Sequence, residues 1–197
     1  AHVAIAVEGV SWSSPDYYPA LVAQAVIGSW DRVSSTANTQ GSKLAQIVSR
    51  NNLASSFMSF STSYHDTGLW GIYLVSDDEH TLDDLVHFTL KQWNRLSVDV
   101  SDAEVERAKS QLKASLLLSL DGTTASAEDI GRQLITTGIR QSPEEVEKVI
   151  DAVTTKDVKA FADKYLWDQD VAIAGLGKIQ FLRDYMRIRN DMTMLRW

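Results

Sequence analysis

The order of apolar patterns along the chain is the feature that most limits its fold. Apolar and small residues alternate at residues 1–10 and again at 171–176, which predicts a strand near each end. Two more strands are expected at 53–64 and 69–75. The turn between them would use Gly68, because glycine adopts positive φ without strain.

Helical spacing dominates most of the remaining chain. Helix-start patterns lie at Ser101, Ser142 and Thr154, each a capping residue with an acidic residue within three positions. Helices are predicted at 16–30 (capped by Ser14, with Pro15 at its first position), 43–50, 81–96, from 101 to about 120, 126–137, from 142, and from 154 or 155 to 166. The stretch 34–42 is expected to be a polar loop. Strands followed by a block of helices predict an α+β fold, a mainly antiparallel sheet with helices on one face, in a single domain spanning 1–197.

Composition excludes several classes of function. The chain has no cysteine, which removes disulfides, thiolate zinc sites and cysteine nucleophiles. Its formal net charge of −7 argues against nucleic-acid binding, because phosphate recognition needs clustered Lys and Arg. No apolar run approaches the roughly 20 residues of a transmembrane helix. The chain begins without Met inside a predicted strand, so we expect a piece of a longer protein.

The metal-like pattern is the acidic stretch 77–84 with His80 and His87. Asp83 and His87 are spaced i, i+4, as are His80 and Asp84, which would suit a surface divalent site. The same residues also suit a helix start, where carboxylates interact favourably with the helix dipole. We favour the helix start, and no HExxH or HxxEH zinc motif occurs.

Three other patterns each allow a functional and a structural interpretation. His65 and Asp66 could form a base and its orienting acid, but no nucleophile elbow accompanies them, and a polar turn is the simpler interpretation. Gly175 and Gly177 follow a strand yet lack the remaining residues of a phosphate loop. The stretch 181–197 is basic and amphipathic, so it either packs on its own domain or docks to a partner or to anionic lipid.

Several longer stretches resemble one family closely. Seven stretches are similar to the second domain of mitochondrial processing peptidase β subunits: 2–12, 15–17, 28–32, the predicted hairpin 59–71, 107–113, 117–122 and 128–133. The tail, at 184–189 and 195–197, resembles the end of core protein I of ubiquinol–cytochrome c reductase. In some lineages one polypeptide fills both roles. The resemblance covers nearly the whole chain.

The resemblance implies an enzymatic function that needs an N-terminal domain and a partner subunit in addition to this chain. The family consists of pitrilysin-type zinc endopeptidases that remove presequences from imported precursors in the mitochondrial matrix. Zinc and its ligands would lie in an N-terminal domain, which leaves no metal site and no catalytic residue in this chain. The implied partners are the α subunit of the peptidase, presequence peptides, and other subunits of ubiquinol–cytochrome c reductase at the inner membrane.

The resemblance also suggests two substrate-binding positions. Many relatives carry an Arg and a Tyr, seven residues apart, that steady the scissile carbonyl. The matching positions here are Arg50 and Phe57, and Phe57 lacks the hydroxyl group. Arg50 also suits the end of a helix, where it complements the dipole. Two other functions stay open: a purely structural core subunit without proteolytic activity, and a stand-alone binding module.

Overall fold

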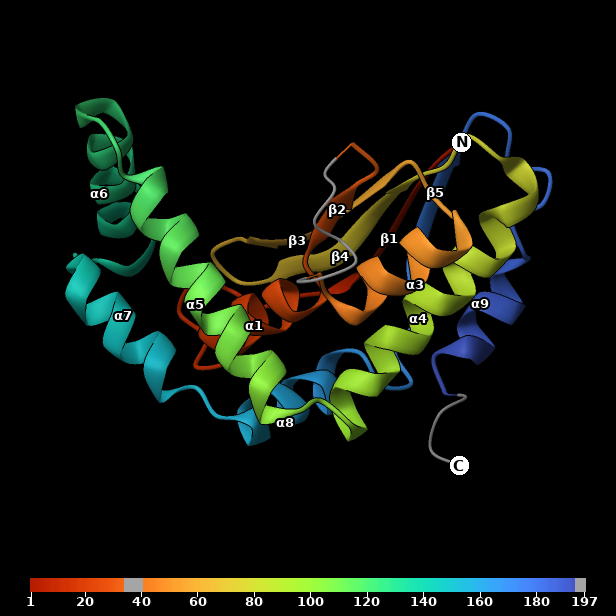
Figure 1. Cartoon of the computed structure of the whole chain (residues 1–197). Helices are drawn as coiled ribbons and strands as arrows, with labels where there is room; N and C mark the ends of the chain where they lie inside the picture. The colour runs from red at the N-terminus through yellow and green to blue at the C-terminus, as the bar shows by residue number, and fades with distance from the viewer. Residues whose placement is uncertain (34–40, 194–197) are drawn as a thin grey trace.

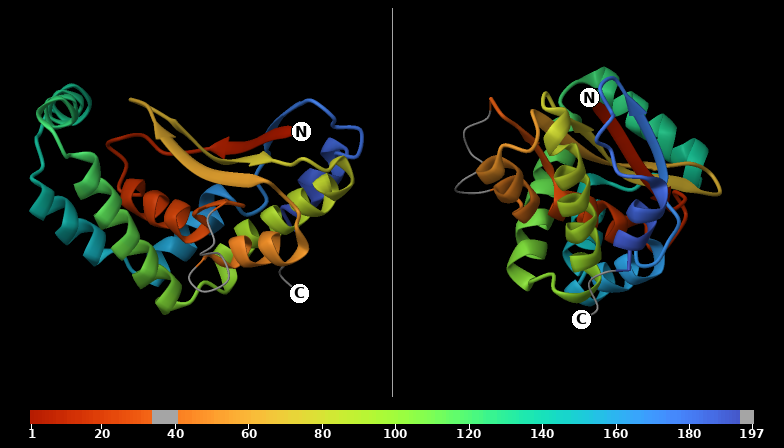
Figure 2. Two further views of the ribbon diagram at one scale, coloured as in Figure 1. Left: turned by 45° about the horizontal axis from the view of Figure 1, so that its top comes forward. Right: turned by 90° about the vertical axis from the view of Figure 1, so that its right-hand side faces the viewer.

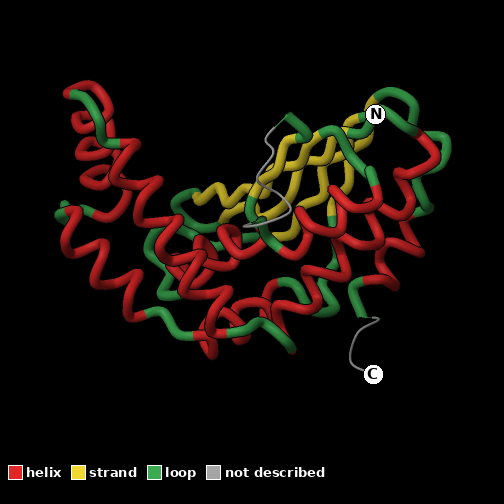
Figure 3. Tube along the Cα trace, in the orientation of Figure 1, coloured by secondary structure: helices red, strands yellow, loops and turns green. Residues whose placement is uncertain are grey.

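The described residues form a five-stranded antiparallel sheet with helices on one face (Figure 1). The structure, a computed structural model, describes residues 1–33 and 41–193. The strand order is β2-β3-β4-β1-β5. The strands are β1 His2–Glu8, β2 Ser29–Asp31, β3 Ser56–Ser63, β4 Gly68–Val75 and β5 Ala172–Leu176. Figure 3 shows the helices gathered beneath the sheet, and the predicted α+β class is confirmed.

The core lies between the sheet and three helices. Residues Val3, Ile5 and Val7 of β1 are buried, and the residues that alternate with them along the strand are exposed or half-buried. The indole of Trp70 on β4 packs edge-on against Trp93, and against Phe161, with ring centroids 5.0 and 6.1 Å away. These two rings come from α4 (Leu82–Val98) and α8 (Thr155–Tyr165), which with α1 (Tyr17–Ile27) cover this face of the sheet.

Local capping chemistry sets the starts of three helices. Ser101, Ser142 and Thr154 each accept a hydrogen bond from the backbone N–H three residues ahead, and each receives the reciprocal capping-box contact. They open α5 (Asp102–Ser119), α7 (Pro143–Ala152) and α8, as predicted. Between α5 and α7 lies α6, Thr123–Thr137, which ends at Gly138 with φ of +73°. The remaining helices are α3 Lys43–Asn51, the 3₁₀ turn η1 Glu79–Thr81, and α9 Tyr185–Asp191.

The helix predicted at 16–30 is shorter in the structure. It begins at Tyr17 after Asp16, and the Ser14 hydroxyl accepts from the Asp16 amide without capping the helix. Gly28, at φ of +73°, ends the helix, and residues 29–31 turn into the unpredicted strand β2. The Ser59 hydroxyl fixes this corner by donating to the Gly28 carbonyl over 2.7 Å. The predicted loop 34–42 lies mostly outside the described residues.

Gly68 is required for a reason other than the predicted one. It does not adopt positive φ. A Cβ built there would lie 2.5 Å from the Val10 carbonyl oxygen and 2.8 Å from that of Thr62. The prediction of positive φ at Gly68 was therefore wrong, and the strand needs glycine because two backbone segments approach it closely.

The C-terminal segment packs on its own domain as far as the structure describes it. Ile188 and Met192 are buried, and the Asn94 side chain on α4 donates to the Asp191 carbonyl over 2.5 Å. Arg183 forms ion pairs with Asp83 on α4 and with Asp191. Of the two interpretations of the tail, the described residues show the packed helix. Among the described helices, none combines the length and apolarity needed to cross a bilayer.

Candidate functional site: the open face of the sheet

The face of the sheet opposite the helices is open among the described residues (Figure 2). Cross-strand partners in an antiparallel sheet point to the same side, so the register defines what this face displays. One row places Met58 beside Tyr73, Tyr73 beside Ala4, and Ala4 beside Ala174. Met58 and Tyr73 are 55% and 38% exposed, which makes this row an accessible apolar strip.

A second row lies on the same face, two residues further along each strand. Phe60 pairs with Gly71, and Gly71 pairs with Ala6. A Cβ on Gly71 would meet the Phe60 ring at 2.7 Å and the Ile5 carbonyl oxygen at 2.3 Å, so the Phe60 ring lies over the glycine. Small residues keep this part of the face shallow, and a flat chain segment could lie across it.

Few ionisable side chains lie on the open face. His2 Nδ1 lies 2.8 Å from the Tyr73 hydroxyl, and their rings are tilted with centroids 5.9 Å apart. At the far end of β1, Glu8 accepts a hydrogen bond from the Thr67 hydroxyl over 2.9 Å. Both pairs lie at the ends of β1, and between them the face displays the apolar rows described above, which suit it to binding.

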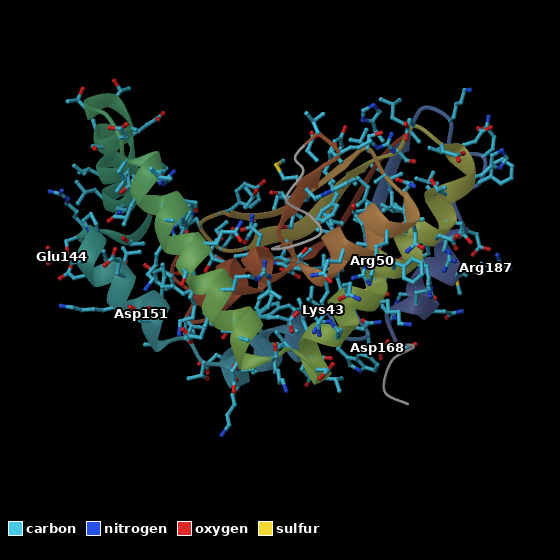
Figure 4. All side chains as sticks on the ribbon, viewed as in Figure 1. Lys43, Arg50, Glu144, Asp151, Asp168 and Arg187 are labelled. Atoms are coloured by element: carbon cyan, nitrogen blue, oxygen red, sulfur yellow. The ribbon has the colours of Figure 1, made fainter. Side chains whose placement is uncertain are left out.

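The two residues predicted to bind substrate are not brought together on one surface. Arg50 is exposed in the last turn of α3, where its charge complements the helix dipole (Figure 4). Phe57 is 3% exposed and faces the helices, with its ring stacked on Trp30 at a centroid distance of 6.4 Å. Arg50 is thus accessible, whereas Phe57 supports the β2–β3 edge from inside.

The acidic stretch and its histidines hold structural contacts. Asp78 caps η1 by accepting from the His80 amide, and the His80 ring packs on Phe181 with centroids 4.4 Å apart. His87 Nδ1 lies 3.1 Å from an Asp191 carboxylate oxygen. Arg183 lowers the pKa of Asp83 by hydrogen bonding. Within residues 1–33 and 41–193, no three His, Asp or Glu side chains are grouped to hold a metal ion.

The His65–Asp66 pattern lies in a turn, and the Gly175–Gly177 pattern lies at the end of β5. His65 and Asp66 are exposed in the β3–β4 hairpin, where the Tyr64 amide donates to the Thr67 carbonyl over 2.8 Å. Gly177, at φ of +97°, ends β5, and a Cβ on Gly175 would sit 3.3 Å from the Ile179 side chain. His65 and Asp66 therefore form part of a turn, and Gly175 leaves room for the Ile179 side chain.

A groove that the sequence did not indicate lies between α1, α5, α6 and α7. It has a volume of about 480 Å³, and Trp12, Tyr17, Leu116 and Val146 are among its lining residues. Burial, followed by the neighbouring Tyr18, raises the pKa of Tyr17 to about 12. The Arg132 guanidinium lies over the Trp12 ring, 5.6 Å from its centroid.

Comparisons with known proteins place the chain in a family. Residues 1–112 match the family described as "Peptidase M16 inactive domain". Two fungal proteins named mitochondrial-processing peptidase subunit beta are similar over nearly the whole chain. The Lentinula edodes protein is 61% identical over 195 residues, covering 99% of this chain and 42% of that protein. The Neurospora crassa protein is 63% identical over 193 residues, covering 98% and 40%.

Respiratory-chain proteins are similar as well. Cytochrome b-c1 complex subunit 1 of Saccharomyces cerevisiae is 47% identical over 199 residues, covering 100% of this chain and 44% of that protein. A chain in the structure "Complex III2 from Candida albicans, Inz-5 bound" superposes with a TM-score of 0.95 at 43% identity. That match covers 98% of this chain and 46% of the other. The chain thus spans less than half the length of these relatives. It belongs to the peptidase M16 family, whose inactive domain its residues 1–112 match.

Proposed function

We propose that this chain is the non-zinc half of a two-domain β-type subunit of a mitochondrial processing peptidase. The full-length subunit would cleave presequences from imported precursors in the mitochondrial matrix, together with an α subunit. The observation that carries the proposal is the identity of 61% and 63% to two processing-peptidase β subunits along the whole chain. The matched structure of a complex III chain supports the same arrangement of elements.

We further propose that the open face of the sheet helps to wall the substrate chamber. The strip formed by Met58, Tyr73 and Ala4 is apolar, accessible and shallow, which suits an extended peptide with apolar side chains. Arg50, exposed at the end of α3, would contact the peptide directly. Phe57 would act indirectly, by supporting the edge of the sheet through Trp30.

In this proposal, zinc is bound by the rest of the full-length subunit and not by this chain. The described residues of this chain offer no fitting group of ligands, because His80 packs on Phe181 and His87 faces Asp191. We propose that the zinc ligands and the catalytic base belong to the remainder of the full-length subunit, outside this chain. This chain would contribute binding surface and support to that part.

A second role follows from the respiratory-chain relatives. We propose that the same subunit also serves as core protein I of ubiquinol–cytochrome c reductase on the matrix side of the inner membrane. The 47% identity to cytochrome b-c1 complex subunit 1 and the Candida albicans structure support this role. The alternative is a purely structural core subunit without proteolytic activity. The higher identity to the peptidase subunits favours the dual role.

A domain replacement tests whether this half supports cleavage, as the peptidase role requires and a purely structural role does not. The matching segment of the Lentinula edodes subunit would be replaced by this chain, and the chimera assembled with the α subunit of that peptidase. We expect presequence peptides to be cleaved with a kcat/KM within about tenfold of the parent enzyme. A folded, assembled chimera that cleaves at least a thousandfold more slowly would favour the structural core subunit.

A further inference from the structure

The dipeptide Asp121–Gly122 joins α5 to α6, and it is the one place in the sequence where Asp or Asn precedes Gly. Glycine has no side chain to shield its own backbone nitrogen, so that nitrogen can approach the carboxyl group of the preceding residue. Attack by the nitrogen closes a five-membered succinimide ring, through which aspartate isomerises. The sequence thus places a candidate site of backbone modification between the two helices.

Both reacting groups at this junction are free among the described residues. Asp121 and Gly122 are exposed. The Asp121 amide donates to the Leu118 carbonyl over 3.3 Å, and the Gly122 carbonyl accepts from the Ser126 amide over 3.1 Å. Within residues 1–33 and 41–193, no hydrogen bond holds the Asp121 carboxylate or the Gly122 N–H.

The backbone at the junction lies outside the two helices that it joins. Helix α5 ends at Ser119, and α6 begins at Thr123 (Figure 1). Gly122 has φ of +121°, and a Cβ built there would meet nothing within 4 Å. Ring closure requires the Asp121 side chain and the following peptide bond to rotate toward each other. The open space around Gly122 permits that rotation.

Other aspartates of the chain lack this combination of features. The carboxylates of Asp129, Asp157 and Asp191 accept hydrogen bonds from other residues, and each of these aspartates is followed by a residue larger than glycine. Asp66 is exposed in the β3–β4 hairpin, but a β-branched threonine follows it. Asp121 therefore joins a free carboxylate to an unhindered nitrogen.

We propose that Asp121 isomerises spontaneously to isoaspartate at this junction. The Gly122 nitrogen attacks Cγ of the protonated Asp121 carboxyl group. The N–Cγ bond forms, and the proton on nitrogen leaves with the carboxyl hydroxyl as water. Water then adds to one of the two ring carbonyls. Cleavage between the nitrogen and the α-carbonyl leaves Gly122 linked through Cγ, whereas cleavage at Cγ restores aspartate, so the mass of the chain is unchanged.

The isomer carries one more carbon atom in the main chain between Leu120 and Ser126. The Ser126 hydroxyl donates to the Leu120 carbonyl over 3.1 Å, and this hydrogen bond spans the junction. Lengthening the main chain separates these two groups. Helix α6 has no buried residue, and a helix of about 15 residues is marginally stable without packing, so its first turn frays. The inference is independent of the proposed function.

The test follows isoaspartate at residue 121 while this chain is incubated at physiological temperature and neutral pH. After proteolysis, liquid chromatography separates the two isomers of the peptide that contains Asp121. An isoaspartyl methyltransferase with S-adenosylmethionine identifies the isomer by methylating it. The rate in the folded chain should lie within about threefold of the rate in a synthetic peptide of residues 117–126, because the junction reacts without unfolding. A rate at least tenfold slower in the folded chain would overturn the proposal.

Ala103→Gly provides the matched control within the same molecule. It creates a second Asp–Gly pair in the first turn of α5, where the Thr155 hydroxyl donates to the Asp102 carboxylate. Ala103 is exposed, so the substitution costs only helix propensity. Isoaspartate should form at Asp102 at least tenfold more slowly than at Asp121. Equal rates at the two pairs would show that the dipeptide alone sets the rate, and that the free junction does not.

A sample enriched in the isomer tests the structural consequence. Amide hydrogens in the first turn of α6 should exchange at least threefold faster than in the parent, whereas those of α8 should keep the parent rate. Unchanged exchange in α6 would contradict the fraying of its first turn. Asp121→Glu would need a six-membered ring, so isomer formation at this position should fall at least tenfold. An unchanged signal in that variant would place the modification elsewhere in the chain.

Discussion

Arg95 Nη2 lies 2.7 Å from Glu104 Oε1, and this ion pair joins the end of α4 to the start of α5. Both side chains are largely buried, at 14% and 13% exposure. Glu104 also accepts from the Ser101 amide over 3.1 Å, and Lys43 on α3 lies 3.4 Å away. The Glu104 carboxylate thus connects α3, α4 and α5, and it also forms part of the capping box that opens α5.

Replacing Glu104 by Gln should destabilise the fold by roughly 2 kcal/mol at pH 7. The side chain keeps its shape, but the largely buried Arg95 loses its charged partner. Burial would raise the pKa of Glu104, but hydrogen bonds from Arg95 and Ser101 outweigh it and lower the pKa to about 2. A lowered pKa stabilises the fold above the unfolded value of 4.5, and this contribution is lost as the pH falls toward 2. Urea unfolding of the parent and Glu104→Gln between pH 7 and pH 2 would measure the difference.

The control for Glu104 is Glu128→Gln on the exposed surface of α6. It should change stability by less than about 0.5 kcal/mol across the same pH range. If the parent and Glu104→Gln lose stability in parallel between pH 4.5 and pH 2, the carboxylate does not hold the helices as described.

Gly71→Ala should destabilise the fold by about 3 kcal/mol, because the new methyl group would meet the Ile5 carbonyl oxygen at 2.3 Å inside the central strands. Gly131→Ala is the matched control. It lies within α6 with no atom within 4 Å of the added Cβ, and alanine is the better helix former, so a gain of about 0.5–1 kcal/mol is expected. Thermal unfolding of both variants would reveal the opposite signs. Equal effects would contradict the close strand packing at Gly71.

Arg183→Ala should release the C-terminal helix, because it leaves the carboxylates of Asp83 and Asp191 without their guanidinium partner. Asp191 is 7% exposed, so the expected cost is about 3 kcal/mol. Hydrogen exchange of the amides of α9 should become at least tenfold faster. Arg187→Ala, on an exposed side chain of the same helix, should leave the exchange unchanged. Unchanged protection in Arg183→Ala would show that apolar packing alone holds the tail.

Arg50→Ala tests the proposed substrate contact in the assembled chimera. If Arg50 binds the peptide, KM for a presequence peptide should rise about tenfold while the melting temperature falls by no more than about 2 °C. Arg50→Lys should recover part of the loss, because it retains the charge. Arg140→Ala, an exposed residue beyond α6, is the control. An unchanged KM in Arg50→Ala would assign Arg50 to the helix dipole only.

The sequence predicted the elements whose causes are local. The capping boxes at Ser101, Ser142 and Thr154 act within three residues, so the starts of α5, α7 and α8 followed from the sequence. Alternation predicted strands at β1 and β4, because burial has a period of two in a strand that has one face on the core.

The features that were missed depend on contacts between distant segments. Strand β2 has only three residues, and it exists because it pairs with β3, nearly thirty positions later. Gly68 meets the backbone of Val10, which no turn pattern reveals. The open apolar strip was not predicted either, because Met58, Tyr73 and Ala4 become neighbours only through the strand order. Family resemblance pointed to Phe57, but only the structure shows its ring turned inward.

The most direct test of the account measures bound zinc and presequence cleavage in two samples, this chain alone and the chimera assembled with the α subunit. We expect less than about 0.1 zinc per molecule and no cleavage for the chain alone, and about one zinc with cleavage for the chimera. Stoichiometric zinc with peptide cleavage by the chain alone would contradict it. That result would mean that His2, His65, His80 or His87 takes part in a metal centre and that the chemistry resides in this half.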